Sequence, residues 1–332
     1  MTTETNGLIL ANKIIVYIYP VVAVIGVITN LLALITFSRK KFQNTVFSTY
    51  FRFLTIFDTL IIAILLNKFV ENNFNIFFRD FSNDLCKFRF FMFYTIYPIS
   101  GWTLVVISID RFINISFTNS RFLFAKKIKF QLIVCLIVMM FNSILSMPNL
   151  FYYLKPSNLT TNQTSIITYK CTNPGFSIEW LDMTVSTLLP FIFMLLFTLL
   201  TIHFLFKSRK NLSKNKQKDV KFALTSIALC LIFFILNLPR AMLQLGNMYD
   251  KNFVPNKDLY QTLTSLFFLI SYINSSTVFF INMIVNKMFR DEFTTLVCSL
   301  LNIRKKTILN NHQSESVNAG GTVVNRVKPS FK

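Results

Sequence analysis

The stretch that decides the fold is residues 14–37, IIVYIYPVVAVIGVITNLLALITF, which contains no charged residue and is soon followed by Arg39-Lys40-Lys41. A bilayer core of about 30 Å requires roughly 20 apolar residues in a helix. Six further apolar segments follow, near residues 46–66, 88–112, 130–154, 181–206, 222–247 and 259–285. A membrane β-barrel would instead show ~10-residue segments of alternating polarity. The chain is therefore predicted to be an all-α membrane protein, a bundle of seven transmembrane helices.

The composition excludes a soluble domain and a disordered chain. Hydrophobic residues make up 53% of the sequence and charged residues 14%, values that fit neither class. The net charge of +20 comes mostly from Lys and Arg after the first and third segments and between the fifth and sixth. Because such residues accumulate in cytosolic loops, we expect an extracellular N-terminus, a cytosolic tail and residence in the plasma membrane. Anionic membrane lipid and acidic partner surfaces explain this charge, and nothing resembles a nucleic-acid-binding domain.

Four regions follow from these boundaries. Residues 1–13 are expected to form an extracellular N-terminus, 14–285 the seven-helix domain, and 302–332 a disordered cytoplasmic tail. Between them, 286–301 carries apolar residues at helical spacing but is too short to span, which predicts an amphipathic eighth helix at the membrane surface. Cys298 in this helix is placed for palmitoylation, and an unmodified thiol is the alternative.

Two of the five cysteines are expected outside the membrane. Cys86 lies at the outer start of the third segment and Cys171 in the loop between the fourth and fifth. Because both would face an oxidising compartment, a disulfide between them is predicted, with two free thiols as the alternative. The same loop carries two glycosylation acceptor sequences, at Asn158 and Asn162.

Polar residues lie inside the first, second, third and seventh segments: Asn30, Asp58, Ser100, Asn274 and Ser275. An ionisable group in the middle of a membrane needs partners. If the five side chains converge, they would form a small hydrated cluster that could hold a sodium ion, or a proton on Asp58. Ordinary hydrogen bonds between helices, worth about 0.6 kcal/mol each, are the alternative. No other cofactor and no further metal is expected.

An acid and an arginine stand side by side where the third segment ends, as Asp110-Arg111 in the run Ser108-Ile-Asp-Arg-Phe112. Charged residues are costly at a hydrocarbon boundary, so this pair points to a function. Pro190 and Pro239 interrupt the backbone hydrogen bonds of the fifth and sixth segments and allow kinks or hinges there.

Taken in order, these positions resemble those of rhodopsin-like (class A) G-protein-coupled receptors across roughly residues 14–300. The resemblance rests on Asn30, on Leu54 to Asp58 as Leu-x-x-x-Asp, on Cys86 with Cys171, on Asp110-Arg111-Phe112 in place of Asp-Arg-Tyr, on Pro190, and on Phe233 to Pro239. Asn237 replaces the tryptophan of the sixth helix, and Val278 and Asn282 replace the asparagine and tyrosine of Asn-Pro-x-x-Tyr. Residues 274–279, NSSTVF, resemble invertebrate FMRFamide-type peptide receptors more closely.

The resemblance implies a transduction switch on the cytosolic side. Arg111 would be held at rest by Asp110 and by Asp219, which precedes the sixth helix's Pro239 by twenty positions. An extracellular ligand would favour an outward swing of that helix about Pro239, which opens a groove for a heterotrimeric G protein. The alternative is that Asp219 only offsets neighbouring lysines on a solvated face.

The expected ligand site lies in the outer part of the bundle. Phe93 stands where amine-binding members carry an aspartate, and no Lys between Asp258 and Lys287 could form a retinal Schiff base. The residues assigned to this site are Phe93, the charged candidates Glu179, Asp182, Arg89 and Arg240, and the amide Gln244. Together with the FMRFamide-type resemblance, these residues favour a short peptide with arginine and aromatic residues. Solvated charges at the membrane edge are the alternative.

Two other classes of function, a transporter and an enzyme, stay open. A transporter coupled to ions or protons could use Asp58, Asp110 and Arg111 as a proton relay, but would more often show repeats and interrupted helices. An enzyme would need a catalytic constellation, whereas the only histidines are His203 and His312. We therefore expect a receptor that is not an enzyme, with an extracellular ligand, a G protein and membrane lipid as partners.

Overall fold

The computed structural model describes residues 13–43, 45, 48–74, 76–116, 128–161, 164–172, 183–208, 214–250 and 253–301. Six helices in these ranges are long and apolar enough to cross a membrane. A seventh span is formed by two consecutive helices, Asp258–Asn274 and Thr277–Val285, that meet at an angle of 47°. The prediction of an all-α bundle with seven spans is confirmed.

The elements follow one another in a simple order. In chain order they are η1 (Ile14–Ile18), α2 (Tyr19–Phe37), α3 (Lys40–Gln43), α4 (Ser48–Phe74), η2 (Phe78–Asp80), α5 (Asn83–Ser116), α6 (Ile128–Leu145), η4 (Met147–Phe151), β1 (Tyr153–Thr161), β2 (Thr164–Thr172), η5 (Thr184–Leu188), α8 (Leu189–Ser208), α9 (Lys214–Tyr249), α10 (Lys257–Asn274), α11 (Thr277–Val285) and α12 (Lys287–Leu300). The chain divides into two compact units, Met1–Arg290 and Asp291–Lys332. The bundle lies in the first unit, which also contains the start of α12.

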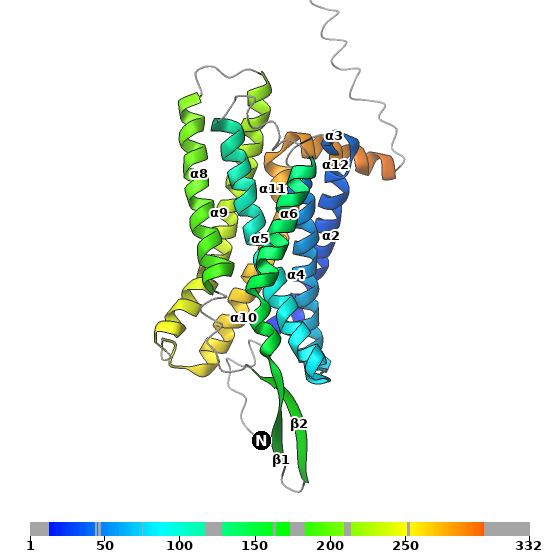
Figure 1. Cartoon of the computed structure of the whole chain (residues 1–332). Helices are drawn as coiled ribbons and strands as arrows, with labels where there is room; N and C mark the ends of the chain where they lie inside the picture. Colours follow the sequence, from blue (N-terminus) through cyan, green and yellow to red (C-terminus); the bar gives the residue numbers. More distant parts are fainter. Residues whose placement is uncertain are drawn as a thin grey trace, which may run out of the picture. The chain divides into compact units, whose positions relative to one another are not determined.

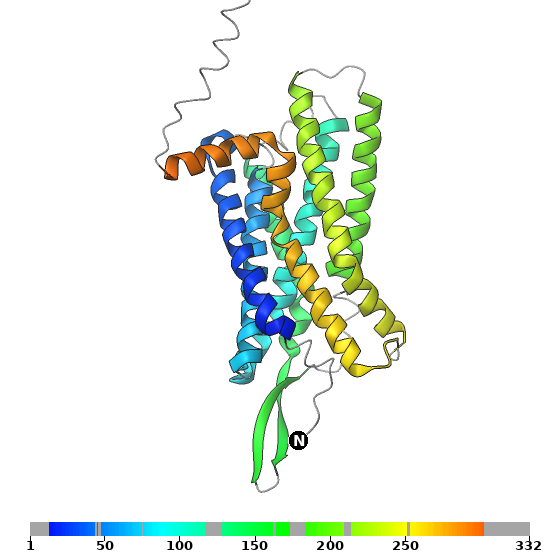
Figure 2. The same ribbon diagram turned by 180° about the vertical axis from the view of Figure 1, so that it is seen from behind.

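Within this first unit the long helices lie alongside one another, and α5 is central because it packs against α4, α6, α8 and α9. The β1–β2 hairpin lies at one end of the bundle and α3 at the other (Figure 1). We call these the hairpin end and the α3 end. The reverse view shows α10 and α11, in yellow to orange, between α2 and α9 (Figure 2).

Apolar side chains cover the outside of the bundle as well as its core. Ile62, Leu65 and Ile99 belong to a buried cluster that joins α2, α4, α5 and α10. On the outside, Ile137 is 58% exposed and Ile235 is 64% exposed. A soluble protein rarely exposes large continuous apolar surface, so this pattern fits a bundle surrounded by lipid.

The bend of the seventh span occurs without a proline. At the junction of α10 and α11, the N–H groups of Ser275 and Ser276 bond to carbonyls three residues earlier rather than four. The Thr277 hydroxyl donates to the Asn274 carbonyl at 2.7 Å. Side-chain hydroxyls and short-range bonds thus satisfy the backbone where the α-helical ladder is interrupted.

Several predicted boundaries differ from the structure. The fourth segment was expected to continue to residue 154, but α6 ends at Leu145 and a 3₁₀ turn follows. Pro148 lies in that turn, and proline disfavours the α conformation of the preceding residue. The third helix begins earlier than expected because the Ser82 hydroxyl accepts from the Leu85 N–H at 3.1 Å and caps α5. Pro98 and Pro239 both lie inside continuous helices, α5 and α9.

Candidate functional site

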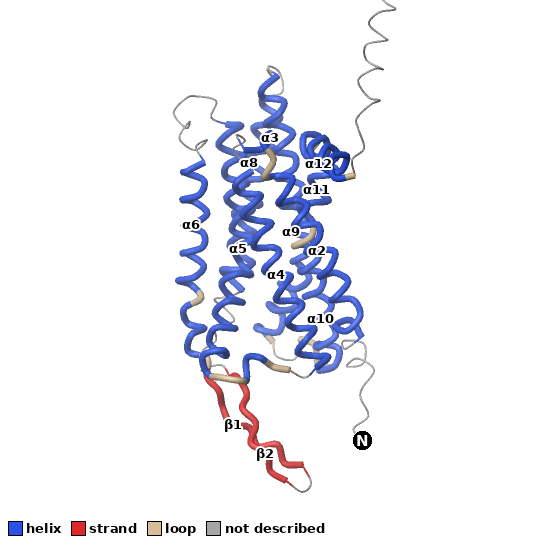
Figure 3. Tube along the Cα trace, turned by 90° about the vertical axis from the view of Figure 1, so that its right-hand side faces the viewer, coloured by secondary structure: helices blue, strands red, loops and turns tan. Residues whose placement is uncertain are grey.

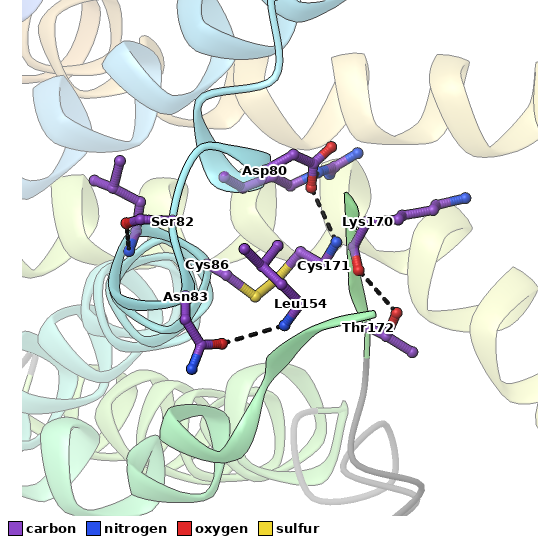
Figure 4. The surroundings of a disulfide bond; sticks show 10 residues. Asp80, Ser82, Asn83, Cys86, Leu154, Lys170, Cys171 and Thr172 are labelled. Atoms are coloured by element: carbon purple, nitrogen blue, oxygen red, sulfur yellow. Dashed lines mark hydrogen bonds and ion pairs between the residues drawn. A yellow bond between two sulfur atoms is a disulfide. The ribbon is translucent and has the colours of Figure 1, made fainter. Parts of the chain in front are cut away.

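A disulfide ties the hairpin to the start of α5. Cys86 and Cys171 are bonded with their Cα atoms 5.7 Å apart, so the predicted disulfide is confirmed. The Asp80 carboxylate accepts from the Cys171 N–H at 2.9 Å, and the Asn83 side chain accepts from the Leu154 N–H at 3.2 Å (Figure 4). Both strands are therefore held at the hairpin end of α5.

The two strands of this hairpin are not predicted from the sequence, which indicates only a loop between the fourth and fifth segments. β1 and β2 pair antiparallel, from Tyr153 opposite Thr172 to Thr161 opposite Thr164. Figure 3 shows the two strands extending beyond the ends of the helices. Asn158 lies in β1, but its side chain and all of Asn162 lie outside the described residues, so glycosylation of both stays a prediction.

The structure brings together most of the predicted polar cluster midway along the bundle. The Ser100 hydroxyl donates to the Asp58 carboxylate at 2.8 Å, and the Ser275 hydroxyl is also a hydrogen-bond partner of that carboxylate. Asn30 donates its amide to the Ser275 carbonyl at 2.9 Å. Asn274 is buried beside this group, but no hydrogen bond of its side chain to a described residue is present. The cluster thus joins α2, α4, α5 and the bend of the seventh span.

The cluster offers a cation only oxygen ligands. Asp58 is 1% exposed and bonds to hydroxyl groups, and no ion pair joins it to a described residue. The side-chain oxygen of Asn30 is buried without a hydrogen-bond partner. Oxygen atoms of this kind suit hard cations. Among the described residues, no group of three or more His, Cys, Asp or Glu side chains that could hold a metal ion occurs, so Asp58 would be the only acidic ligand of a cation here.

The acid–arginine pair is buried at the α3 end of α5. A nitrogen of the Arg111 guanidinium lies 2.7 Å from the Asp110 carboxylate, and the two side chains are 4% and 7% exposed. Asn114 donates to the Asp110 carbonyl at 2.8 Å. Asp219 lies in α9, but its side chain is outside the described part of the chain, so a contact with Arg111 stays a prediction.

In the hairpin half of the bundle, α5 and α9 meet through side chains that the sequence did not identify as partners. The Tyr97 hydroxyl points to the Asn237 side-chain oxygen at 3.4 Å, a long hydrogen bond, and Asn237 donates to the Phe233 carbonyl at 2.9 Å. The Arg240 guanidinium lies over the rings of Tyr97 and Phe268, 4.3 and 4.4 Å from their centroids. Asn237 thus links the two helices at the residue where the resemblance expects a tryptophan.

The structure describes three of the other predicted ligand-site residues, Arg89, Phe93 and Gln244, and each has a different environment. Arg89 pairs with Glu71 of α4 at 3.1 Å, so its guanidinium already has an acid inside the protein. Phe93 stacks with Tyr97 at a centroid distance of 5.9 Å, and the Gln244 side-chain oxygen is buried without a partner. Glu179 and Asp182 lie outside the described residues, and their role stays a prediction.

A cavity of about 500 Å³ opens between α4 and α5 in the same half of the bundle. Its lining is mostly apolar and includes Ile64 and Met92, with Asn67, Arg79 and Arg89 as polar groups. Pockets of this size accommodate small ligands or parts of larger ones.

An aromatic cluster occupies the α3 end of the seventh span. Phe289 is fully buried, and its ring lies 4.9 Å from that of Phe37 and 5.9 Å from that of Phe279. Asn282, also fully buried, donates to the Val278 carbonyl at 2.8 Å. Phe279 and Asn282 stand where the resemblance expects the proline and tyrosine of Asn-Pro-x-x-Tyr, so rings and an amide pack this region instead.

The second unit of the chain contains Cys298, on α12. Its thiol is free and partly exposed. These are conditions that acylation requires, and lipidation stays a prediction.

Comparison with known proteins agrees with this geometry. A family model described as "7 transmembrane receptor (rhodopsin family)" matches residues 29–277, about three quarters of the 332 residues. No curated protein matches the chain. Because the family model covers well over half of the sequence, the chain belongs to the rhodopsin family of seven-transmembrane receptors. It is a multi-pass membrane receptor and not an enzyme. Members of its family respond to extracellular ligands and signal through heterotrimeric G proteins. The transporter alternative is not favoured.

Proposed function

We propose that this member of the rhodopsin family binds a short extracellular peptide at its hairpin end and activates a heterotrimeric G protein at its α3 end. The N-terminus and the hairpin then face the outside of the plasma membrane, and the Lys- and Arg-rich α3 end faces the cytosol. The distribution of positive charge supports this orientation, as does the disulfide at the hairpin end, because disulfides persist in oxidising compartments.

The observation that carries the peptide proposal is the disulfide-anchored hairpin. It is a two-stranded sheet, so each strand pairs on one side only within the described chain and has a second edge of backbone groups. An extended peptide can add to such an edge through main-chain hydrogen bonds. Because β2 is covalently joined to α5 at Cys86, a peptide bound there would act directly on the helix that carries Asp110 and Arg111 near its other end.

The proposed switch lies at the other end of α5. Asp110 holds Arg111 at 2.7 Å in a buried pair, and release of Arg111 would expose a cation to the docking helix of a G protein. Breaking a buried pair leaves a charge without compensation, so the change is favourable only when a partner replaces Asp110. We also propose that Asp219 contributes to holding Arg111 at rest and that Pro239 is the hinge of α9.

The Asp58 cluster is proposed to bind a sodium ion in the resting state. The buried carboxylate without an ion-pair partner and the unpartnered Asn30 oxygen support this proposal. The resemblance to FMRFamide-type receptors supports a ligand that carries basic and aromatic residues.

A G-protein dissociation assay in cells tests the proposal. Cells that express the receptor are challenged with a library of short neuropeptides, and an Arg111→Ala variant at equal surface expression is the control. A peptide response that Arg111→Ala abolishes supports the function. Uptake or current that follows an ion gradient, without any G-protein response to the library, would contradict it.

A further inference from the structure

Two arginines among the described residues are buried, Arg111 and Arg240, and they differ in one respect. Arg111 has the carboxylate of Asp110 at 2.7 Å. Arg240 is 5% exposed, and its Nε and Nη1 atoms are fully buried without a hydrogen-bond partner. No ion pair joins Arg240 to any residue that the structure describes. A buried charge ordinarily requires a partner of opposite charge, so the surroundings of Arg240 are electrostatically incomplete.

The groups around Arg240 attract a cation but leave its Nε and Nη1 donors without a hydrogen-bond partner. The ring centres of Tyr97 and Phe268 lie 4.3 and 4.4 Å from the central carbon of the guanidinium. Such contacts use the electron-rich faces of the rings. The five N–H groups of a guanidinium point outward in its own plane, and there the rings offer no acceptor.

Gln244 lies one helical turn beyond Arg240, on the same face of α9. Its side-chain oxygen is also buried without a hydrogen-bond partner. A half-turn of the amide exchanges this oxygen for the NH₂ group, so Gln244 can donate to an acceptor that Arg240 binds. Two neighbouring residues in the hairpin half of α9 therefore have unused hydrogen-bonding capacity in a shielded position.

We infer that Arg240 and Gln244 form a subsite for a carboxylate group of the ligand. This inference rests on the proposed function, because it assumes that the ligand enters from the hairpin end. A carboxylate supplies the missing negative charge, and its two oxygens match the guanidinium fork in a bidentate arrangement. An ammonium group would be repelled, and a neutral amide would leave the charge of Arg240 uncompensated. The ligand is therefore an acid at this point, through its C-terminus or an acidic side chain.

The first test measures the stability of the empty receptor and needs no ligand. The full chain is purified in lipid nanodiscs, and the thermal unfolding midpoints of Arg240→Met and Arg89→Met are compared with that of the wild type. Arg89→Met removes the partner of the buried Glu71 carboxylate and should lower the midpoint. Arg240→Met removes an unpaired buried charge while keeping contact with the aromatic rings, so its midpoint should equal or exceed that of the wild type.

The second test uses N-acetylphenylalanine and N-acetylphenylalaninamide, two probes that share a ring and differ in the carboxylate. At millimolar concentration, the acid should raise the unfolding midpoint of the wild-type receptor and the amide should not. Arg240→Met should weaken the acid about 100-fold, because it removes charge-assisted hydrogen bonds. Arg52→Met is the matched control, since Arg52 bonds to Ser48 at the α3 end, and it should respond to the acid as the wild type does.

Several results would overturn the subsite. They are a loss of stability in Arg240→Met as large as that in Arg89→Met, equal effects of the acid and the amide, a full response of Arg240→Met to the acid, and no response of the wild type to either probe. The proposed function fails separately. An acid effect that depends on Arg240, without G-protein activation by any peptide, would support the subsite and contradict the peptide ligand. Peptides that activate equally as acids and as amides would do the reverse.

Discussion

Gly26 provides a quantitative test of how tightly the bundle is packed around the bend of the seventh span. It lies on α2, between Ile62 of α4 and Ser276 at the bend. A Cβ atom added at this position would lie 2.6 Å from the Ser276 hydroxyl oxygen and closer still to the end of the Ile62 side chain. Such approaches are far inside van der Waals contact, so Gly26→Ala forces neighbouring groups to move.

The net effect follows from two opposing terms. Replacing glycine by alanine inside a helix stabilises it by about 0.5–1 kcal/mol. Overpacking a core costs about 1–3 kcal/mol, and the upper part of that range applies because Ile62 is fully buried and the hydroxyl at the bend must move as well. We therefore expect Gly26→Ala to destabilise the receptor by about 1–2 kcal/mol.

The assay is thermal unfolding in nanodiscs at one fixed scan rate, because membrane proteins often unfold irreversibly. Gly101→Ala is the matched control. Its added Cβ would lie 3.3 Å from the Phe233 ring and 3.4 Å from Pro190, distances that small shifts relieve, so its midpoint should stay near that of the wild type. Ile62→Val removes the obstructing methyl group and should recover part of the stability lost in Gly26→Ala. The reasoning is refuted if Gly26→Ala is as stable as Gly101→Ala, or if Ile62→Val and Gly26→Ala combine additively.

Three further predictions concern the two ends and the middle of the bundle. Replacing Cys86 and Cys171 together by serine should cost about 4–5 kcal/mol, because the disulfide closes a separation of 85 residues, and an unchanged unfolding midpoint would contradict this. Asp219→Ala should raise basal G-protein signalling at equal surface expression, since it removes a proposed restraint on Arg111, and unchanged basal activity would remove that restraint from the mechanism. Sodium should raise the unfolding midpoint of the wild type but not of Asp58→Asn, relative to potassium at the same ionic strength, and equal responses would exclude a sodium site at Asp58.

The number of spans and the disulfide were predictable because each depends on a local property of the sequence: the length of an apolar segment, or the side of the membrane on which a cysteine lies. A span requires about 20 apolar residues, and residues 14–37 meet that requirement without any knowledge of their neighbours. Cys86 and Cys171 were assigned to the same compartment by the positions of Lys and Arg. Neither inference required knowing how any helix is rotated about its own axis.

The side-chain partners could not be predicted for the opposite reason. Arg89 was expected to face a ligand, but it faces Glu71, and which of these occurs depends on how α4 and α5 are rotated relative to each other. The contact of Arg240 with Tyr97 and Phe268 likewise joins three helices. Packing of complete helices determines such contacts, and local sequence does not contain that information.

The hairpin and the bend were missed although a signal existed for each. Residues 164–169, TSIITY, are rich in β-branched and aromatic residues and read as a strand. At the bend, Ser275, Ser276 and Thr277 have hydroxyl groups that can bond to the backbone and compete with the helical ladder. The hairpin lies where only a loop was expected, and the bend lies where a continuous membrane helix was expected. In each case this expectation was preferred to the local preference of the residues for a strand or for an interrupted helix.

One face of α5 connects the features described above. Its members, in order, are Tyr97, which lies under Arg240 and bonds to Asn237; Ser100, which bonds to Asp58; Ser108, whose hydroxyl lies 3.1 Å from the Cys230 sulfur; and Arg111, which pairs with Asp110. Their spacings of three, eight and three residues bring all four to the same side of a helix with 3.6 residues per turn. A carboxylate that binds at the proposed Arg240 subsite would draw the guanidinium away from the Tyr97 ring. The hydroxyl of the same tyrosine bonds to Asn237, two positions before Pro239, the proposed hinge. On this face, Tyr97 and Ser108 contact α9, and Ser100 contacts α4. The proposed swing of α9 would therefore separate the contacts of Tyr97 and Ser108 and leave that of Ser100 intact. One face of α5 thus carries both the contacts to α9 that the proposed swing would change and the contact to α4 that would hold α5 in place during it.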